Sequence, residues 1–220
     1  HPDQVQVIRG ESKILRSIVG VPNVVQFHNI FETHKFICIH MEHLKGNSMK
    51  LHIKKRLALA LKTMNIDGKD SSDDESAEEV DQVKGQNIFT KFQDPIKFWK
   101  HQLSIKENEI KYLKESLYPE EDAALIMRGF LNGLYHIHEL NYIHRDIKPE
   151  NIQMAPSGMS YDQLKIIDFG FSAKMRMGIK NSHEEKIGTA LYMAPEQISS
   201  QVYGKKIDIY AAGIVLYTLL

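Results

Sequence analysis

Three short runs in the second half of the chain carry side chains that could do chemistry. They are HRDIKPEN from His144 to Asn151, DFG at 168–170 and APE at 194–196. Asp146 could accept or orient the proton of a substrate hydroxyl. The oxygens of Asn151 and Asp168 are hard ligands of the kind that magnesium prefers, and Lys148 adds a positive charge beside them. Each tripeptide alone is a weak signal, but the three in this order are a strong one.

In this order the three runs resemble the catalytic motifs of the eukaryotic protein kinase family. Lys148, two residues after Asp146, is the form usual in serine/threonine kinases. The resemblance covers most of the chain outside residues 50–118. It implies transfer of the ATP γ-phosphate to serine or threonine hydroxyls of a protein substrate, with ATP and Mg²⁺ as cofactors. Asp146 would then be the base and Lys148 the cation at the phosphate, while Asn151 and Asp168 would bind the metal.

The resemblance also implies roles for residues outside these runs. Glu11 matches the glutamate that pairs with the family's nucleotide-binding lysine. Met41 matches the gatekeeper, and the backbone groups of Glu42 and Leu44 match those that hold the adenine edge. Thr189 stands where these kinases use a hydroxyl to bridge the catalytic aspartate and lysine. These residues are expected to complete the nucleotide and catalytic sites.

Some positions depart from the family pattern. Gln153 occupies the place of an apolar residue under the adenine ring, where an amide buried without partners would cost about 1 to 3 kcal/mol. Ser48 stands near the position where an acidic residue often binds the ribose, and the residues before Glu11 include neither a glycine-rich loop nor a lysine. A pseudokinase, which binds or scaffolds without turnover, therefore remains an alternative. Lys148 and the run GTALYMAPE at 188–196 disfavour a kinase of small molecules.

The segment 168–196 suggests how activity is controlled. In the family, the arginine at the position of Arg145 receives a phosphorylated residue, and Glu185 lies eleven residues before the APE glutamate. A fixed carboxylate there could replace the phosphate, with Glu184 as a substitute partner, so we expect activity without phosphorylation of this segment. The alternative is that both glutamates are merely solvated. Two serines remain candidate phosphorylation sites: Ser172 and Ser182.

Helices and strands must hold these residues in place. Apolar spacing predicts a short helix over residues 11–19, ended by Pro22, and two antiparallel strands within 24–42. Pro119, followed by three acidic residues, marks the start of a long helix with one buried face. The apolar run 209–220 is shorter than the roughly 20 residues of a membrane span and predicts a buried helix.

These elements and the resemblance predict an α+β, two-lobed protein kinase fold that is truncated at both ends. Residues 1–49 would form a partial N-lobe with helix C, two strands and the hinge. Residues 50–118 would hold helix D and a long, partly disordered acidic and basic insertion. Residues 119–220 would form a mainly helical C-lobe, cut off in helix F. Asp208 would brace the catalytic loop, and it could also cap the start of that helix. The resemblance also places four residues in the family's stacked spine: Leu15, Phe27, His144 and Phe169.

Composition excludes several other classes of protein. Lys and Arg total 28, as do Asp and Glu, so no basic field points to nucleic acid. The single cysteine, Cys38, excludes an internal disulfide framework, and eleven histidines without a cysteine cluster give no zinc site. We expect an intracellular, cytoplasmic protein without a membrane span. The insertion within 50–118 could bind a regulatory partner. In its acidic stretch 70–81, Ser71 and Ser72 suit an acid-directed kinase acting on this protein, and the alternative is an inert linker.

Overall fold

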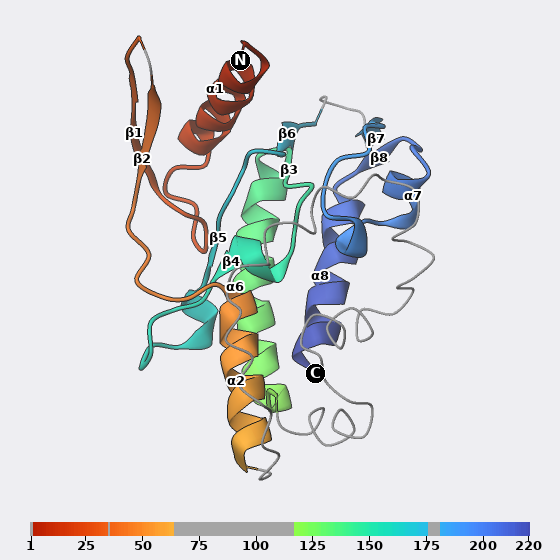
Figure 1. The fold of residues 1–220 in the computed structure, drawn as a ribbon. Coiled ribbons are helices and arrows are strands. Elements are labelled where there is room, and N and C mark those ends of the chain that lie inside the picture. Colours follow the sequence, from red (N-terminus) through yellow and green to blue (C-terminus); the bar gives the residue numbers. More distant parts are fainter. Residues whose placement is uncertain (1, 35, 64–116, 176–180) are drawn as a thin grey trace.

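The computed structural model describes residues 2–34, 36–63, 117–175 and 181–220 (Figure 1). Helix α1 (Pro2–Ser17) packs beside a hairpin of β1 (Phe27–Glu32) and β2 (Ile37–Met41). Figure 1 shows α1 in red and the hairpin in orange-red, beside the green α6 and the blue α8, which contact each other. The described residues therefore form a mixed layer of one helix and two strands on a mainly helical body.

Helix α1 is longer than the sequence predicts. It begins at Pro2 rather than at residue 11, and it ends at Ser17 shortly before Pro22, as expected. The sequence hides its first half because Gly10 interrupts the pattern with a residue that disfavours helices. Ile8 lies two turns before the buried Leu15, on the same face of the helix, and is itself half-buried. The helix therefore continues through a residue of weak helix propensity.

The predicted strand pair is confirmed. β1 and β2 run antiparallel, with Phe27 opposite Met41 and Phe31 opposite Cys38, and the register shifts once near the start of β1. Phe27 is buried, while Phe31 and Cys38 are exposed. Ile30 and Ile39, which are opposite each other, pack partly buried against the core, so one face of the hairpin covers the core and the face with Phe31 and Cys38 is exposed.

Helix α6 (Glu120–Glu139) confirms the predicted start after Pro119. Three carboxylates lie in its first turn, where they suit the positive end of the helix dipole. Its buried face is the predicted one: Ala123, Ile126, Met127, Phe130, Leu134 and Ile137. The apolar run at 209–220 belongs to α8 (Lys206–Leu219), which begins early enough to include Asp208. Within the described part of the chain, no helix is long and apolar enough to cross a membrane.

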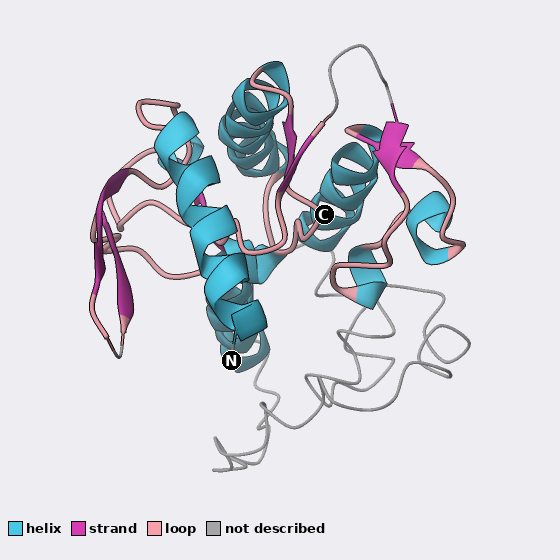
Figure 2. Ribbon diagram, turned by 90° about the horizontal axis from the view of Figure 1, so that it is seen from above, coloured by secondary structure: helices cyan, strands magenta, loops and turns pink. Residues whose placement is uncertain are grey.

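Between α6 and α8 the chain is held by short antiparallel strand pairs and single turns of 3₁₀ helix (Figure 2). The pairs are β3 (Tyr142–Ile143) with β6 (Ala173–Lys174), β4 (Ile152–Gln153) with β5 (Lys165–Ile166), and β7 (Asn181–His183) with β8 (Tyr203–Gly204). The 3₁₀ turns are Pro149–Asn151, Tyr161–Gln163 and Ala190–Tyr192, and the short helix α7 is Pro195–Ile198. Loops fastened in this way can present side chains at fixed positions.

Helix α2 (Met49–Thr63) occupies the start of the predicted region 50–118. Its Arg56 guanidinium lies 4.2 Å from the ring centre of Tyr118 and donates to the hydroxyl of Tyr161 at 3.1 Å. Burial raises the pKa of Tyr118, and this residue lies just before α6. The chain therefore returns to α2 at Tyr118. The acidic stretch 70–81, with Ser71 and Ser72, lies outside the described residues, as does the part 64–116 of the insertion expected to bind a regulatory partner.

Gly46 marks a close approach between the segment after β2 and the catalytic half of the chain. A Cβ atom on Gly46 would lie 1.8 Å from the carbonyl oxygen of Met154, and the Met154 amide donates to Asn47 at 2.9 Å. We expect Gly46→Ala to lower the free energy of unfolding by about 1 to 3 kcal/mol, because the backbones must separate. Urea unfolding of the purified chain measures this.

Gly10 provides the matched control. A Cβ atom there meets nothing within 4 Å, and the residue lies inside α1. Gly10→Ala should therefore leave stability unchanged or raise it by up to about 1 kcal/mol. Equal stability of the Gly46→Ala variant and the parent chain would contradict the close approach.

Candidate active site

The catalytic loop brings four of the predicted residues together around one carboxylate. Asp146, only 3% exposed, accepts a hydrogen bond from Thr189 Oγ1 at 2.7 Å and lies 3.0 Å from Lys148 Nζ. Lys148 Nζ also donates to Thr189 Oγ1 at 2.9 Å. Asn151 Nδ2 donates to both the backbone oxygen and the carboxylate of Asp146, at 2.9 and 3.1 Å. The aspartate is thereby held in one orientation by three neighbours.

Asp208 of α8 fixes the backbone of the catalytic loop. It is 1% exposed, and its two oxygens accept from the amides of His144 and Arg145, both at 2.9 Å. His138 Nε2 lies 2.8 Å from the same carboxylate. Both oxygens are occupied by α6 and the loop, so Asp208 braces the loop as predicted and does not cap α8. Sequence reasoning missed His138, although it neighbours Ile137 on the buried face of α6.

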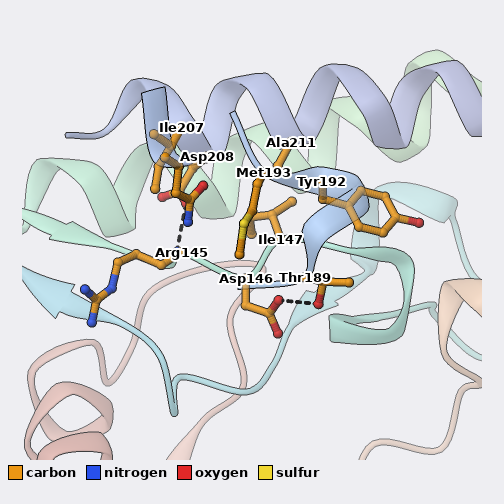
Figure 3. Close-up of a pocket in the computed structure, with 10 residues that line it drawn as sticks. Arg145, Asp146, Ile147, Thr189, Tyr192, Met193, Ile207, Asp208 and Ala211 are labelled. Atoms are coloured by element: carbon orange, nitrogen blue, oxygen red, sulfur yellow. Dashed lines mark hydrogen bonds between the residues drawn. The ribbon is translucent and has the colours of Figure 1, made fainter. Parts of the chain in front are cut away.

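Figure 3 shows Asp208 and the catalytic loop lining a small cavity against α8. Its volume is about 10 Å³, which is room for about one water molecule. Asp146 and Thr189 lie at one side of it, joined by their hydrogen bond. A nucleotide cannot fit in this cavity.

The two predicted metal ligands, Asn151 and Asp168, lie on two backbone segments that run next to each other. The amide of Ile167, next to Asp168, donates to the backbone oxygen of Asn151 at 2.9 Å. Because the Asn151 Nδ2 atom points at Asp146, the Asn151 Oδ1 atom is directed away from that residue. Asp168 is exposed and adopts a positive φ of 63°, with one carboxylate oxygen accepting from the Gly170 amide at 3.2 Å. This pair of hard oxygen donors fits Mg²⁺.

Glu11 of α1 lies next to the same metal-ligand segment. Burial raises the pKa of Glu11, the charge of Asp168 raises it further, and the backbone amide of Phe169 opposes the shift. No ion pair involves Glu11 in the part of the chain that the structure describes. Phe169 is fully buried, and its ring lies 5.0 Å from that of His144, both expected spine residues. Leu15 and Phe27, the other two, are buried in the same core as Phe169.

The expected hinge follows directly after β2, which ends at Met41. Met41 is 38% exposed, and Leu44 packs partly buried against the core. The Glu42 carboxylate accepts a hydrogen bond from Lys165 Nζ at 2.6 Å and another from the backbone amide of Gln26 at 2.7 Å. Sequence reasoning missed Lys165 and Gln26, because no motif marks either residue.

Two departures from the family pattern have local partners. The side-chain amide of Gln153 donates to the backbone oxygen of Gly46, so the cost expected for an unpaired buried amide does not arise. Ser48 lies directly before α2, where its hydroxyl accepts from the Leu51 amide at 3.3 Å. Ser48 therefore caps a helix, as serine commonly does.

The segment 168–196, called the activation segment below, is attached to the catalytic loop through Arg145. Its Nη1 lies 3.3 Å from the Glu185 carboxylate, and its Nε donates to the backbone oxygen of Phe171 at 2.6 Å. The structure pairs Arg145 with Glu185 rather than with Glu184, although both glutamates are exposed. The Glu185 backbone amide, and then the charge of Arg145, lower the pKa of the Glu185 carboxyl. Ser172 donates to the backbone oxygen of His144 at 3.3 Å, and the side chain of Ser182 lies outside the described residues.

Comparison with known proteins matches residues 58–220 to the protein kinase domain family. The chain belongs to the protein kinase family. It is 42% identical to calcium-dependent protein kinase 22 of Arabidopsis thaliana over 105 residues, which are 48% of this chain and 20% of that protein. It is 42% identical to calcium-dependent protein kinase 4 of Plasmodium falciparum over 101 residues, 46% of this chain and 19% of the relative.

A human relative shows the same pattern. Serine/threonine-protein kinase DCLK3 is 38% identical over 103 residues, 47% of this chain and 15% of that protein. The matched stretch thus spans a fifth or less of each of these curated relatives. The predicted family is confirmed, and the α+β kinase fold agrees with it.

The position of Glu11 in this kinase domain predicts a pH-dependent stability. Because burial and Asp168 raise its pKa above the ordinary 4.5, the folded chain binds a proton that the unfolded chain has released. The resulting stability is fully present below pH 4.5 and is lost as pH rises through the raised pKa. We expect Glu11→Gln to be more stable than the parent chain at pH 7 and equal to it at pH 4, measured by urea unfolding.

The exposed Glu139, changed to Gln in the same way, controls for the loss of a surface charge. A stability difference between parent and Glu11→Gln that stays the same at both pH values would contradict the predicted proton uptake.

Proposed function

We propose that the protein is a serine/threonine protein kinase that transfers the γ-phosphate of ATP to protein hydroxyls. The observation that carries the proposal is the buried Asp146, held by Lys148, Asn151 and Thr189 within 3.1 Å. These are the residue types that phosphoryl transfer requires around the acceptor hydroxyl. The names of the relatives, which include a serine/threonine-protein kinase, support the choice of acceptor.

In this proposal the chain orients the reactants and moves one proton. Asp146 accepts the proton of the substrate hydroxyl while that oxygen bonds to the γ-phosphorus and the bond to the departing ADP breaks. Lys148 Nζ, already 3.0 Å from Asp146, places positive charge where the phosphoryl group transfers. Asn151 and Asp168 would hold Mg²⁺, which supplies neutralisation of phosphate charge when bound. Thr189 keeps Asp146 and Lys148 in register through its hydroxyl.

The nucleotide half of the proposed site lies along the segment after β2. The backbone groups of Glu42 and Leu44 would hold the adenine edge, with Met41 as the gatekeeper beside it. Gln153 lies below this segment, tied to Gly46 by its side-chain amide. Glu11, next to Asp168, would pair with a nucleotide-binding lysine. Nucleotide and metal ligands would thus approach Asp146 from the side of α1 and the hairpin.

Asp146→Asn tests the proposed chemistry. The asparagine preserves the shape and can still bond Thr189, but it cannot take up the proton. Magnesium-dependent transfer of the ATP γ-phosphate to a generic protein substrate, measured with the full-length natural protein, should fall by about 10² to 10⁴.

Asp162→Asn is the matched control, because Asp162 lies on the turn Tyr161–Gln163 and pairs with Arg128 instead. It should keep the parent rate. A folded parent protein that transfers no phosphate would contradict the proposed function and favour the pseudokinase, the alternative class.

We further propose that phosphorylation of the activation segment is unnecessary for activity. Arg145 is only 10% exposed in its side chain, so the Glu185 carboxylate neutralises a largely desolvated cation. Tyr203 donates its hydroxyl to the Glu185 backbone oxygen at 2.7 Å, and His183 Nδ1 lies 3.5 Å from the carboxylate. β7 pairs with β8 beside these contacts. A protein side chain thus supplies the anion that a phosphate group would otherwise supply.

Glu185→Ala tests this proposal. Loss of the carboxylate leaves Arg145 without its anion, so we expect kcat of the unphosphorylated protein to fall about tenfold, as expected for breaking one partly buried charge contact. Mass spectrometry verifies the absence of phosphate in the parent. Glu184→Ala, a neighbouring exposed glutamate, should keep the parent kcat. Parent-like activity of Glu185→Ala would overturn the proposal.

A further inference from the structure

Three segments of the chain meet at a single ion pair away from the catalytic loop. Lys165 Nζ lies 2.6 Å from the Glu42 carboxylate and 3.5 Å from the backbone oxygen of Val24. The same carboxylate accepts a hydrogen bond from the backbone amide of Gln26 at 2.7 Å. In return, the backbone amide of Glu42 donates to the backbone oxygen of Gln26 at 2.9 Å. The loop after α1, the segment after β2 and strand β5 are therefore joined at one point.

Each of these segments leads directly to a residue of the proposed site. Strand β5 holds Lys165 and continues to Asp168 within three residues. Glu42 itself supplies a backbone group to the proposed adenine contact. The loop around Val24 follows α1, which carries Glu11. The ion pair is thus a common anchor for the metal-ligand strand, the hinge and the helix that carries Glu11.

The loop after α1 is itself stiffened by the side chain of Gln26. Its Nε2 donates to the backbone oxygens of Val21 and Val24 at 3.0 and 2.9 Å, and its Oε1 accepts from the Gly20 amide at 2.7 Å. This loop is also paired with β5, since the Val25 amide donates to the Ile166 oxygen at 3.0 Å. Movement of Glu42 relative to β5 must therefore break several bonds together.

Burial gives the ion pair energetic weight. The side chains of Lys165 and Glu42 are 28% and 24% exposed, so neither charge is fully solvated. Removing the cation would leave a partly desolvated carboxylate beside the hinge, which is costlier than losing an exposed surface pair. The carboxylate would then be expected to turn toward water and release the Gln26 amide.

We propose that Lys165 is a positioning residue for the nucleotide, acting through Glu42 and resting on the proposed kinase function. The lysine fixes the Glu42 side chain, and through it the backbone groups that would hold the adenine edge. It does not touch the reacting atoms. Loss of its charge should therefore weaken nucleotide binding and leave the chemical step nearly unchanged.

Lys165→Met tests this with two measurements. Hydrogen exchange of the Gln26 and Glu42 amides, measured on the chain without turnover, should become about tenfold faster, because coupled contacts of this kind contribute on that scale. In the full-length natural protein, KM for ATP should rise about fivefold while kcat stays within about twofold of the parent. Lys165→Arg, which keeps the charge, should restore both values.

Lys54→Met, which removes an exposed lysine of α2, should change neither measurement. Parent-like exchange in Lys165→Met, a failed rescue by Lys165→Arg, or a higher kcat at unchanged KM would overturn the proposal. Should Lys165→Met fail to fold, Glu42→Gln breaks the same pair and is expected to give the same two changes. A parent protein without phosphoryl transfer would contradict the proposed function, while the exchange measurement would still test the anchor.

Discussion

The buried carboxylate of Asp208 is the constraint on which the rest of the site depends. A charge with 1% exposure is stable only if donors surround it, and here these donors are the amides of His144 and Arg145 and the ring of His138. Satisfying Asp208 fixes the loop backbone, including the positive φ of 69° at Arg145. The direction of Asp146, and the reach of Arg145 toward the activation segment, follow from that backbone.

Hydrogen bonds and ion pairs connect the catalytic loop to the chain segments on its two sides. Thr189 and Glu185 connect Asp146 and Arg145 to the activation segment. On the opposite side, the hydrogen bond between the Ile167 amide and the Asn151 backbone oxygen connects the loop to the segment that carries the proposed metal ligand Asp168. The same segment reaches the hinge and the loop after α1 through Lys165. The core packs α1 and β1 in one apolar cluster with α6, so these polar links lie on a common scaffold.

Much of this arrangement could be predicted from local patterns. The catalytic runs identified the family. Pro119 and the acidic residues after it predicted the start of α6, and two apolar runs predicted the β1–β2 hairpin. These elements were predictable because they depend on residues that are neighbours in the sequence. The first half of α1 escaped prediction because Gly10 interrupts its apolar pattern. The contacts of His138, Lys165 and Gln153 also escaped, because their partners lie 70, 123 and 107 residues away.

The sequence alone therefore determined the family and the residue types on which the proposed chemistry rests: a carboxylate, hard oxygen donors and a lysine. Only the tertiary structure decided which charges meet. It selected Glu185 over Glu184 as the partner of Arg145, and it gave Gln153 an acceptor. The physical reason is that residue type and spacing specify local conformation, whereas burial and pairing of charges depend on segments that fold together from distant parts of the chain.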